Sequence, residues 1–502
     1  MSEITSTPDG AGAPIEEEKP TLADRERGFF GHPWGLANLS AIEMWERFSF
    51  YGMQALVAYY IYYSVADGGL GYSESAATSI VGAYGGLVYL SAIFGGWISD
   101  RLFGAERSLT GAAVLIMLGH ISLSLIPGMT GVGIGLIAIA LGSGTLKATT
   151  SVVVGVMYRR SDMRRDAAFS IYYMGVNIGG LIGPLATNAL WEGTNFHWGF
   201  ALAAFGMAAG LIQYLALRGK TLSSIPKGAL NPATPKHISI VGGAAAIVVV
   251  IIVISALAGW LTFDNLASVV TVVTIVAAIL LFGVILSSKQ ITAVERSRVI
   301  AFIPMFLASC GFWALFQQQF TSIAVLADQA LDRNVFGWDF PPGWVQSINP
   351  LFIIIFAGVF SAMWLKLGDR QIATPYKFAL SNVVMGIAFL VFIPFTDGMI
   401  PMLVMVVVLF LFTMAELLLS PLGQSLATKL APAAFNSQMV ALFFLSVAIG
   451  SSASGWLAGF YNPDDQAATN QYFMWIGIAS IVLGIVIALV ANPVVRLMKG
   501  VR

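Results

Sequence analysis

The sequence predicts an all-α integral membrane protein with fourteen membrane-spanning helices. The 502-residue chain is 57% hydrophobic and only 10% charged, whereas soluble domains are about 25% charged. Its mean hydropathy is +0.80. Apolar stretches of the roughly 20 residues needed to cross hydrocarbon recur from about residue 36 to the C-terminus. A single soluble core could not bury that much apolar surface.

The first 34 residues differ from the rest of the chain. They hold Pro8, Pro14, Pro20 and an acidic run at 16–18, with few apolar residues, so we expect a disordered cytoplasmic tail at 1–34. A basic stretch followed by an apolar one is missing, and we therefore expect no cleaved signal peptide.

The remaining chain divides into two six-helix bundles and a linker. We expect an N-terminal bundle at 35–220, a linker with two extra transmembrane helices at 221–296, and a C-terminal bundle at 297–502. The spans are expected at 36–63, 76–100, 108–127, 131–158, 166–190, 197–218, 238–260, 265–287, 299–327, 344–366, 374–395, 399–430, 433–460 and 470–497. The two linker spans are rich in Val, Ile and Ala, which predicts a lipid-facing hairpin.

The basic residues orient these spans. Of the 26 Lys and Arg residues, Arg47 and Lys147 fall deep within spans and Arg333 in an outer loop, and the other 23, in loops or near span ends, are assigned to the cytoplasmic side. The outer loops instead carry acids. The positive-inside rule therefore predicts that both termini are cytoplasmic.

A faint internal repeat supports two related halves. Trp97-Ile-Ser-Asp100-Arg101 follows the second span, and Trp364-Leu-Lys-Leu-Gly-Asp369-Arg370 follows its counterpart. The repeat alone is weak, but with the span count it favours the major facilitator fold, two bundles around a central cavity. Glycines at small-xxx-small spacing are expected to let helices pack closely; they are Gly175, Gly179, Gly183, Gly455 and Gly459.

Five charged residues stand out within the predicted spans, away from the span ends: Glu43, Glu46, Arg47, Lys147 and Glu416. A charge at the bilayer centre costs roughly 2.5–3.5 kcal/mol, so such residues are functional candidates. The first three share one helix face. Two cations in one half and an anion in the other predict a site for a zwitterion; a local ion pair that holds helices together is the alternative.

The first span also carries a family signature. Glu43-Met-Trp-Glu46-Arg47-Phe48-Ser49-Phe50-Tyr51-Gly52 resembles the ExxERFxYY motif of the proton-dependent oligopeptide transporters. Matching stretches continue to about residue 498: Gly142-Ser-Gly-Thr-Leu-Lys147, Phe169-Ser-Ile-Tyr-Tyr-Met-Gly-Val-Asn177-Ile-Gly179, Phe312-Trp313-Ala-Leu-Phe-Gln317-Gln318, Asn349-Pro350 and Glu416-Leu-Leu-Leu-Ser420-Pro421-Leu-Gly423. Bacterial members of that family likewise insert two helices between the bundles.

The resemblance implies a proton-coupled symporter that imports di- and tripeptides by alternating access. It places the peptide carboxylate on Arg47 and Lys147 and the amino group on Glu416. Further substrate-binding residues implied are Tyr51, Tyr89, Asn177, Trp313, Gln317, Asn349, Ser420 and Phe443. For the aromatic residues among them, ordinary helix packing is the alternative.

Proton coupling is expected at Glu43, Glu46 and Glu416, because a carboxylate that loses a cationic partner takes up a proton. Three departures from the family pattern matter. Gln54 and Gln317 stand where many members pair an arginine with an acid across the outer gate, so we expect an amide–amide contact. Gly82 stands where animal members carry a histidine, and His120, on another helix, is expected to be a packing residue.

Other classes of function fit these residues less well. A carrier of another solute, such as nitrate or a peptide-like drug, shares the fold, but the charges of the first span favour peptides. An enzyme would need a nucleophile, a metal cluster or a cofactor motif, and a channel would not explain charges in opposite halves. We expect no enzyme activity, no metal and no cofactor besides the coupling proton. The expected setting is the cell membrane, as a monomer in the lipid bilayer without nucleic acid.

Overall fold

The computed structural model describes residues 21–501 except 160, 161, 163, 224, 226, 227 and 230. Its helices are α1 Leu22–Arg25, α2 Trp34–Tyr62, α3 Glu74–Ile98, α4 Ala105–Leu125, α5 Gly128–Val156, α6 Arg164–Gly193, α7 Phe196–Thr221, α8 Pro235–Leu257, α9 Leu266–Ser287, α10 Ala293–Phe316, α11 Ser322–Gln329, α12 Ile348–Leu367, α13 Thr374–Leu390, α14 Met402–Lys429, α15 Asn436–Ala458 and α16 Gln466–Leu497. Four two-residue strands lie in loops: β1 Leu331–Asp332, β2 Asn334–Val335, β3 Trp338–Asp339 and β4 Ile400–Pro401. β1 pairs with β4 in parallel, and β2 with β3 antiparallel.

The predicted number of spans is confirmed. Within the described residues, 13 helical segments are long and apolar enough to cross a membrane, with α10 and α11 counted as one. Helix α2 is the fourteenth span. Its 29 residues are long enough to cross a membrane, but Glu43, Glu46 and Arg47 make it less apolar than the other 13 segments.

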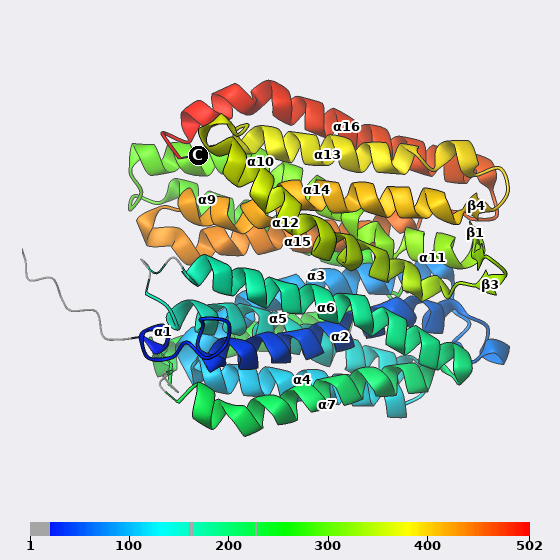
Figure 1. Ribbon diagram of the computed structural model, residues 1–502, viewed down its shortest axis with the longest axis horizontal. Helices are drawn as coiled ribbons and strands as arrows, with labels where there is room; N and C mark the ends of the chain where they lie inside the picture. The colour runs from blue at the N-terminus through cyan, green and yellow to red at the C-terminus, as the bar shows by residue number, and fades with distance from the viewer. Residues whose placement is uncertain are drawn as a thin grey trace, which may run out of the picture.

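The spans form two bundles (Figure 1). Helices α2–α7, blue to green, make the lower layer, and α10–α16, yellow-green to red, the upper one. In the first bundle α2 packs on α6 and α7, and α4 on α5; in the second, α13 packs on α16 and α14. The bundles meet chiefly where α3 lies against α15 and α6 against α12. This arrangement is the major facilitator fold.

Glycines permit close approaches between these helices, as predicted. A Cβ on Gly179 would lie 2.2 Å from the carbonyl oxygen of Met44 in α2. A Cβ on Gly82 of α3 would lie 2.5 Å from the Cα of Gly455 in α15. Both helix pairs therefore contact backbone to backbone, and the glycines act in packing.

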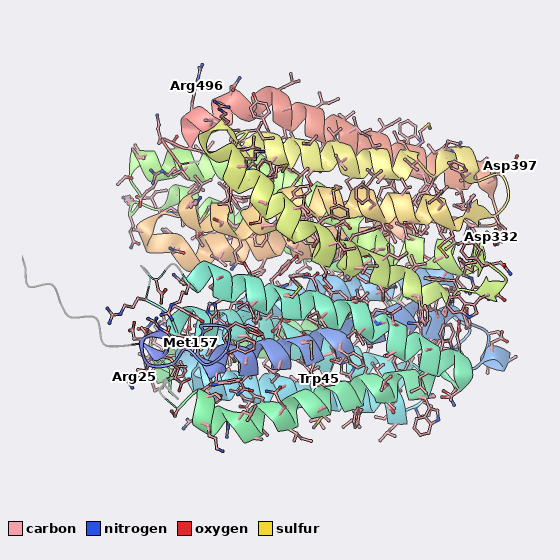
Figure 2. All side chains as sticks on the ribbon, viewed as in Figure 1. Arg25, Trp45, Met157, Asp332, Asp397 and Arg496 are labelled. Carbon is pink, nitrogen blue, oxygen red and sulfur yellow. The ribbon has the colours of Figure 1, made fainter. Side chains whose placement is uncertain are left out.

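The two ends of the molecule differ in charge. Figure 2 labels Arg25 and Arg496 at one end, and Asp332 and Asp397 at the other. We call them the basic end and the acidic end. Four of the basic residues assigned to the cytoplasm lie outside the described residues: Lys19, Arg160, Lys227 and Arg502.

The linker hairpin differs from its predicted form. Helix α8 is exposed along its apolar window, but α9 packs in the seam between α3 and α15. Thr271 of α9 donates to Ser452 Oγ of α15 at 2.9 Å, and the Ala267 amide donates to Ser79 Oγ of α3 at 3.0 Å. The lipid-facing prediction is therefore wrong for one face of α9, whose threonine hydroxyls were the missed signal.

Residues 21–33 also differ, since they are docked where the sequence predicts a disordered tail. The Ala23 amide donates to the Met157 carbonyl at 3.0 Å, and Arg164 donates to the carbonyls of Ala23 and Gly31 at 2.9 and 3.2 Å. His32 lies 2.9 Å from the hydroxyl of Tyr158. This docked segment covers the α5–α6 connection at the basic end. The rest of the predicted tail, residues 1–20, lies outside the described residues, and the domain boundaries stay predictions.

The span of α10 and α11 is interrupted at a run of glutamines. A 3-10 turn at Gln317–Phe320 separates the two helices. The Oε1 atom of Gln318 accepts from the hydroxyls of Ser322 at 2.6 Å and Tyr472 at 2.9 Å. Side chains thus satisfy polar groups at the break, as a discontinuous membrane helix requires.

Candidate functional site

The site begins with a buried ion cluster on α2. Arg47 Nε lies 2.6 Å from Glu46 Oε2 and 3.3 Å from Glu43 Oε1. All three side chains are at most 5% exposed. The buried Nη2 of Arg47 has no hydrogen-bond partner among the described residues. An unpaired guanidinium nitrogen beside a satisfied one is suited to bind a further anion.

Helix α5 adds two residues one turn apart. Ser143 donates a hydrogen bond to Glu46 Oε1 at 2.6 Å. Four residues later, the Lys147 ammonium lies 4.5 Å from the centre of the Tyr89 ring on α3. Among the described residues Lys147 has no carboxylate within 4.0 Å. Its charge is therefore held by a π face rather than by an acid.

The opposite pole belongs to the second bundle. Glu416 of α14 is 9% exposed. Asn349 of α12 donates to Glu416 Oε2 at 3.2 Å and to Thr413 Oγ1 at 3.0 Å. No cation lies within 4.0 Å of Glu416 among the described residues, so one amide is its polar partner.

Tyrosines lie between the two poles. Tyr51 and Tyr89 are close enough to Arg47 and to Glu416 to interact electrostatically with both. Tyr173 of α6 also interacts electrostatically with Glu416, Tyr51 and Tyr89. The Tyr51 ring is stacked on Phe320 of the second bundle, with centroids 6.0 Å apart. The cation pole and the anion pole thus flank one group of aromatic rings.

The remaining predicted residues are distributed around this centre. Trp313 packs its backbone against Gly450 of α15 and keeps a buried Nε1 without a described partner. Phe443 lies over Gly423 of α14, where a Cβ would meet its ring at 2.3 Å. Ser420 is half-buried one turn beyond Glu416. Asn177 donates to the carbonyl of Tyr173 at 2.9 Å.

The predicted contact between Gln54 and Gln317 is wrong for this conformation. Gln317 donates instead to Ser451 Oγ of α15 at 3.0 Å, within its own bundle. The buried Oε1 of Gln54 accepts no hydrogen bond from the described residues. Sequence reasoning paired the two amides because both depart from the family pattern, and it had no signal for the nearer hydroxyl.

Gly82 and His120 are both buried in helix packing. The α3–α15 contact at Gly82 leaves no room for a histidine, because even a Cβ would clash with Gly455. His120 is fully buried on α4, and neither ring nitrogen has a described partner. Neither position lies with the ion cluster.

Hydrogen bonds join the bundles toward the acidic end. Asp328 of α11 accepts from Tyr62 at the end of α2 and from Tyr63, which follows it, each at 2.6 Å. Trp344 and Ser347 donate to the α6 carbonyls of Leu185 and Leu181 at 2.9 and 2.8 Å. The structure is therefore closed on the acidic side of the site.

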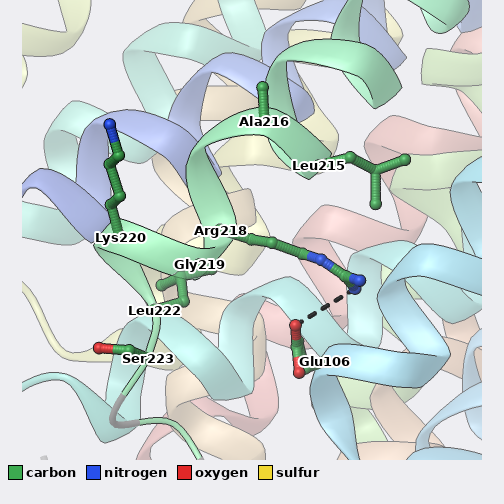
Figure 3. A pocket seen from close by; sticks show the side chains of 8 residues that line it. All are labelled: Glu106, Leu215, Ala216, Arg218, Gly219, Lys220, Leu222 and Ser223. Atoms are coloured by element: carbon green, nitrogen blue, oxygen red, sulfur yellow. Dashed lines mark ion pairs between the residues drawn. The ribbon is translucent and has the colours of Figure 1, made fainter.

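A pocket at the basic end is separate from the ion cluster on α2 (Figure 3). It is about 480 Å³ and lies beside the end of α7. Arg218 points toward Glu106 and pairs with it at 3.3 Å, whereas Lys220 points away from that pair. Because this pocket contains none of the predicted substrate residues, we do not assign it to the substrate.

Comparison with known proteins identifies the family. The sequence matches the POT family (PTR2) over residues 108–476. It is 38% identical over 493 residues to the uncharacterized transporter YclF of Bacillus subtilis strain 168, covering 97% of this chain and 100% of that protein. The chain belongs to the POT family.

Further similarities support this assignment. The chain is 37% identical over 501 residues to a di-/tripeptide transporter of Lactococcus lactis subsp. cremoris, covering 96% of this chain and 99% of that one. A crystal structure of the peptide transporter POT in complex with sulfate superposes with a TM-score of 0.90 at 43% identity, covering 95% of this chain and 99% of that one. These similarities confirm the predicted family and fold of this POT-family protein.

Sequence reasoning missed several residues of the site. Ser143 falls four residues before Lys147, and this spacing alone places both on one helix face. Tyr62, Tyr63 and Asp328 gave no signal, because nothing in the sequence relates residues more than 260 positions apart. Thr413, three residues before Glu416, is detectable by the same helical spacing.

Proposed function

We propose that this POT-family protein is a proton-coupled symporter that imports di- and tripeptides across the cell membrane. The observation that carries the proposal is the pair of opposed poles. Arg47 and Lys147 belong to one bundle and Glu416 to the other, and Tyr51 and Tyr89 interact with both poles. The similarity to a di-/tripeptide transporter supports the same substrate class.

A peptide would bridge the poles in an extended form. Its carboxylate binds the unpaired Nη2 of Arg47 and the ammonium of Lys147. Its amino group binds Glu416, whose one hydrogen-bond partner among the described residues is the Asn349 amide. Asn177, Asn349, Ser420 and Gln317 supply polar atoms, while Trp313 and Phe443 form walls. Affinity then comes mainly from the charged ends, so varied side chains are accepted.

Charge balance supplies the reason for coupling. With every group ionised, Glu43 and Glu46 balance Arg47 and Lys147. An arriving peptide carboxylate adds one negative charge to this buried cluster, and a proton on Glu46 or Glu43 restores neutrality. The peptide amino group meanwhile neutralises Glu416. Proton and peptide are therefore favoured together, and no metal or cofactor is needed.

The basic end faces the cytoplasm in this proposal, with both termini inside. Because the bundles are joined toward the acidic end, the conformation is then closed to the outside. Alternating access requires that these outer contacts break while contacts at the basic end form. The protein acts as a monomer, since each chain contains both poles. Labelling of a terminal tag from outside intact cells would contradict this orientation.

The deciding experiment is uptake of labelled dialanine into proteoliposomes, with and without an inward proton gradient. We expect accumulation only with the gradient. Lys147→Ala should reduce it by about tenfold or more, because a charge-assisted contact with the carboxylate is lost. Lys366→Ala, a lysine at the basic end, is the matched control and should transport normally. Gradient-independent uptake, or normal uptake by Lys147→Ala, would refute the proposal.

A further inference from the structure

A second cavity lies at the acidic end, between the two bundles. It is about 370 Å³, and its lining includes Tyr63, Trp191, Glu192 and Arg333. Ligand pockets for small molecules begin at roughly 300 Å³. The connection after α2 and the end of α6 in the first bundle, together with the loop after α11, form its walls. It is therefore separate from the ion cluster on α2.

Arg333 is unusual in its surroundings. Of the described residues, it is the one basic side chain at an end that otherwise carries acids. Its Nη1 donates to the Phe340 carbonyl at 3.3 Å, which fixes one edge of the guanidinium. That contact leaves the other nitrogens available to a carboxylate, for which the planar fork of arginine is well suited.

Glu192 lies on the same cavity but is not bonded to Arg333. The two interact electrostatically, yet they form no ion pair within 4.0 Å in the described part of the chain. Opposite charges thus stand apart across a cavity. A ligand that carries both an ammonium and a carboxylate would fill that gap.

The floor of the cavity is rigid and aromatic. Trp191 stacks on Phe196 with centroids 4.6 Å apart and on Tyr59 at 5.7 Å, and its edge contacts Tyr63 at 5.7 Å. Such a ring cluster provides apolar surface for side chains without an ordering cost. It has no preference for one side chain over another.

We propose that this cavity is an outer entrance site that binds zwitterionic di- and tripeptides before they reach the central site. Arg333 takes the carboxylate, Glu192 the amino group, and the Trp191 ring the side chains. Simple anions are disfavoured by Glu192 and by Asp67, which also lines the cavity, and simple cations by Arg333. The inference rests on the proposed function, because it requires that peptides are the cargo and that the acidic end faces outside.

The cavity is also joined to the closure of the bundles. Tyr63 lines it and donates to Asp328 Oδ1 at 2.6 Å. A bound peptide therefore lies directly beside a bond that must break when the outer side opens. Binding at this site places the substrate where opening occurs.

The first test is the concentration dependence of uptake. Arg333→Gln and Glu192→Gln should each raise the KM for dialanine uptake by about three- to tenfold and leave the maximal rate within about twofold. KM for efflux from the basic side should not change. Gln466→Glu adds one negative charge to the same end outside the cavity, which matches the charge change of Arg333→Gln, and it should behave as wild type.

The second test is direct binding. Saturation-transfer NMR of dialanine with the purified Lys147→Ala protein should retain a signal from the outer site. That signal should fall by about three- to tenfold in Lys147→Ala/Arg333→Gln and persist in Lys147→Ala/Gln466→Glu. An unchanged KM in both cavity variants, or equal signals in the two double variants, would overturn the entrance site while wild-type uptake still supported the proposed function. Absence of peptide uptake by the wild type would instead overturn the proposed function.

Discussion

Ser143 of α5 donates a hydrogen bond to Glu46 of α2 across 2.6 Å. This bond links the carboxylate that pairs with Arg47 to the helix that carries Lys147. A change in the charge of Glu46 therefore acts on both cation-bearing helices at once. We therefore expect this contact to couple protonation to substrate binding.

Removal of the Ser143 hydroxyl should weaken coupling more than binding. Hydrogen bonds to charged groups contribute about 1.5–3 kcal/mol, so Ser143→Ala should lower proton-driven accumulation of dialanine by about tenfold. Counterflow, the exchange of labelled for unlabelled peptide, should fall by less. Ser151→Ala is the control, because its hydroxyl donates to the backbone carbonyl of Lys147 rather than to a carboxylate. Equal losses in both assays would show that Ser143 serves folding alone.

Neutral amides in place of the α2 carboxylates test where the proton is carried. Glu46→Gln should abolish concentrative uptake yet preserve counterflow, because exchange needs no titrating group. Glu43→Gln should have a similar or milder effect, since its ion pair with Arg47 is longer, 3.3 against 2.6 Å. If both variants accumulate peptide normally with a proton gradient, the coupling group lies elsewhere, and Glu416 is the next candidate.

The bonds from Tyr62 and Tyr63 to Asp328 should hold the acidic side closed. Loss of both hydroxyls in Tyr62→Phe/Tyr63→Phe should shift the protein toward the outward-open state. The readout is a cysteine at Gln54, in a Cys310→Ala background, labelled by an impermeant thiol reagent from outside. We expect labelling to be about tenfold faster.

Tyr60→Phe provides the matched control for this gate. Its hydroxyl contacts the Gly128 amide within the first bundle and does not join the two bundles. Labelling in this variant should equal that of the parent. An unchanged rate in the double variant would show that the other contacts between the bundles are sufficient for closure.

The seam between α3 and α15 should tolerate no side chain. Gly82→Ala places a Cβ 2.5 Å from Gly455 Cα, and overpacking of this kind costs about 1–3 kcal/mol. We expect lower thermal stability and slower transport. Gly111→Ala on α4 meets nothing within 4 Å and should be neutral. A stable, fully active Gly82→Ala would mean that the two helices move apart at little cost.

Local sequence patterns predicted most of the fold. Contacts between residues far apart in the sequence were not predicted. The poles at Arg47, Lys147 and Glu416 were predictable because a charge within an apolar span has few explanations. The hydrogen-bond partner of Gln317 could not be predicted, because Ser451 lies 134 positions away and serines occur in membrane helices for many reasons. Helix α9 was misjudged for the same reason, because hydropathy does not distinguish a lipid-facing surface from a helix seam.

The docked segment at 21–33 was missed because only a few of its residues, such as Leu22 and Ala23, bury apolar side chains, and its other contacts are specific hydrogen bonds. The buried histidine among these contacts also makes docking sensitive to pH. The pKa of His32 lies below its usual value because burial, and then the charge of Arg164, disfavour the protonated ring, while Asp162 opposes this in part. The docked state therefore binds protons less readily than the undocked one, and docking gains stability as pH rises.

Docking should be complete above the ordinary histidine pKa of about 6.5 and weaken as pH falls below it. Hydrogen exchange of residues 21–33, corrected for intrinsic rates, should show less protection at pH 5.5 than at pH 7.5. His32→Phe keeps a ring in the buried position but cannot titrate, so its protection should depend little on pH. His237→Phe, a histidine at the exposed start of α8, should leave the pH dependence unchanged. If His32→Phe loses protection at low pH as the wild type does, another group controls docking, and the carboxylate of Asp24, which pairs with Arg159 at 3.0 Å, becomes the candidate.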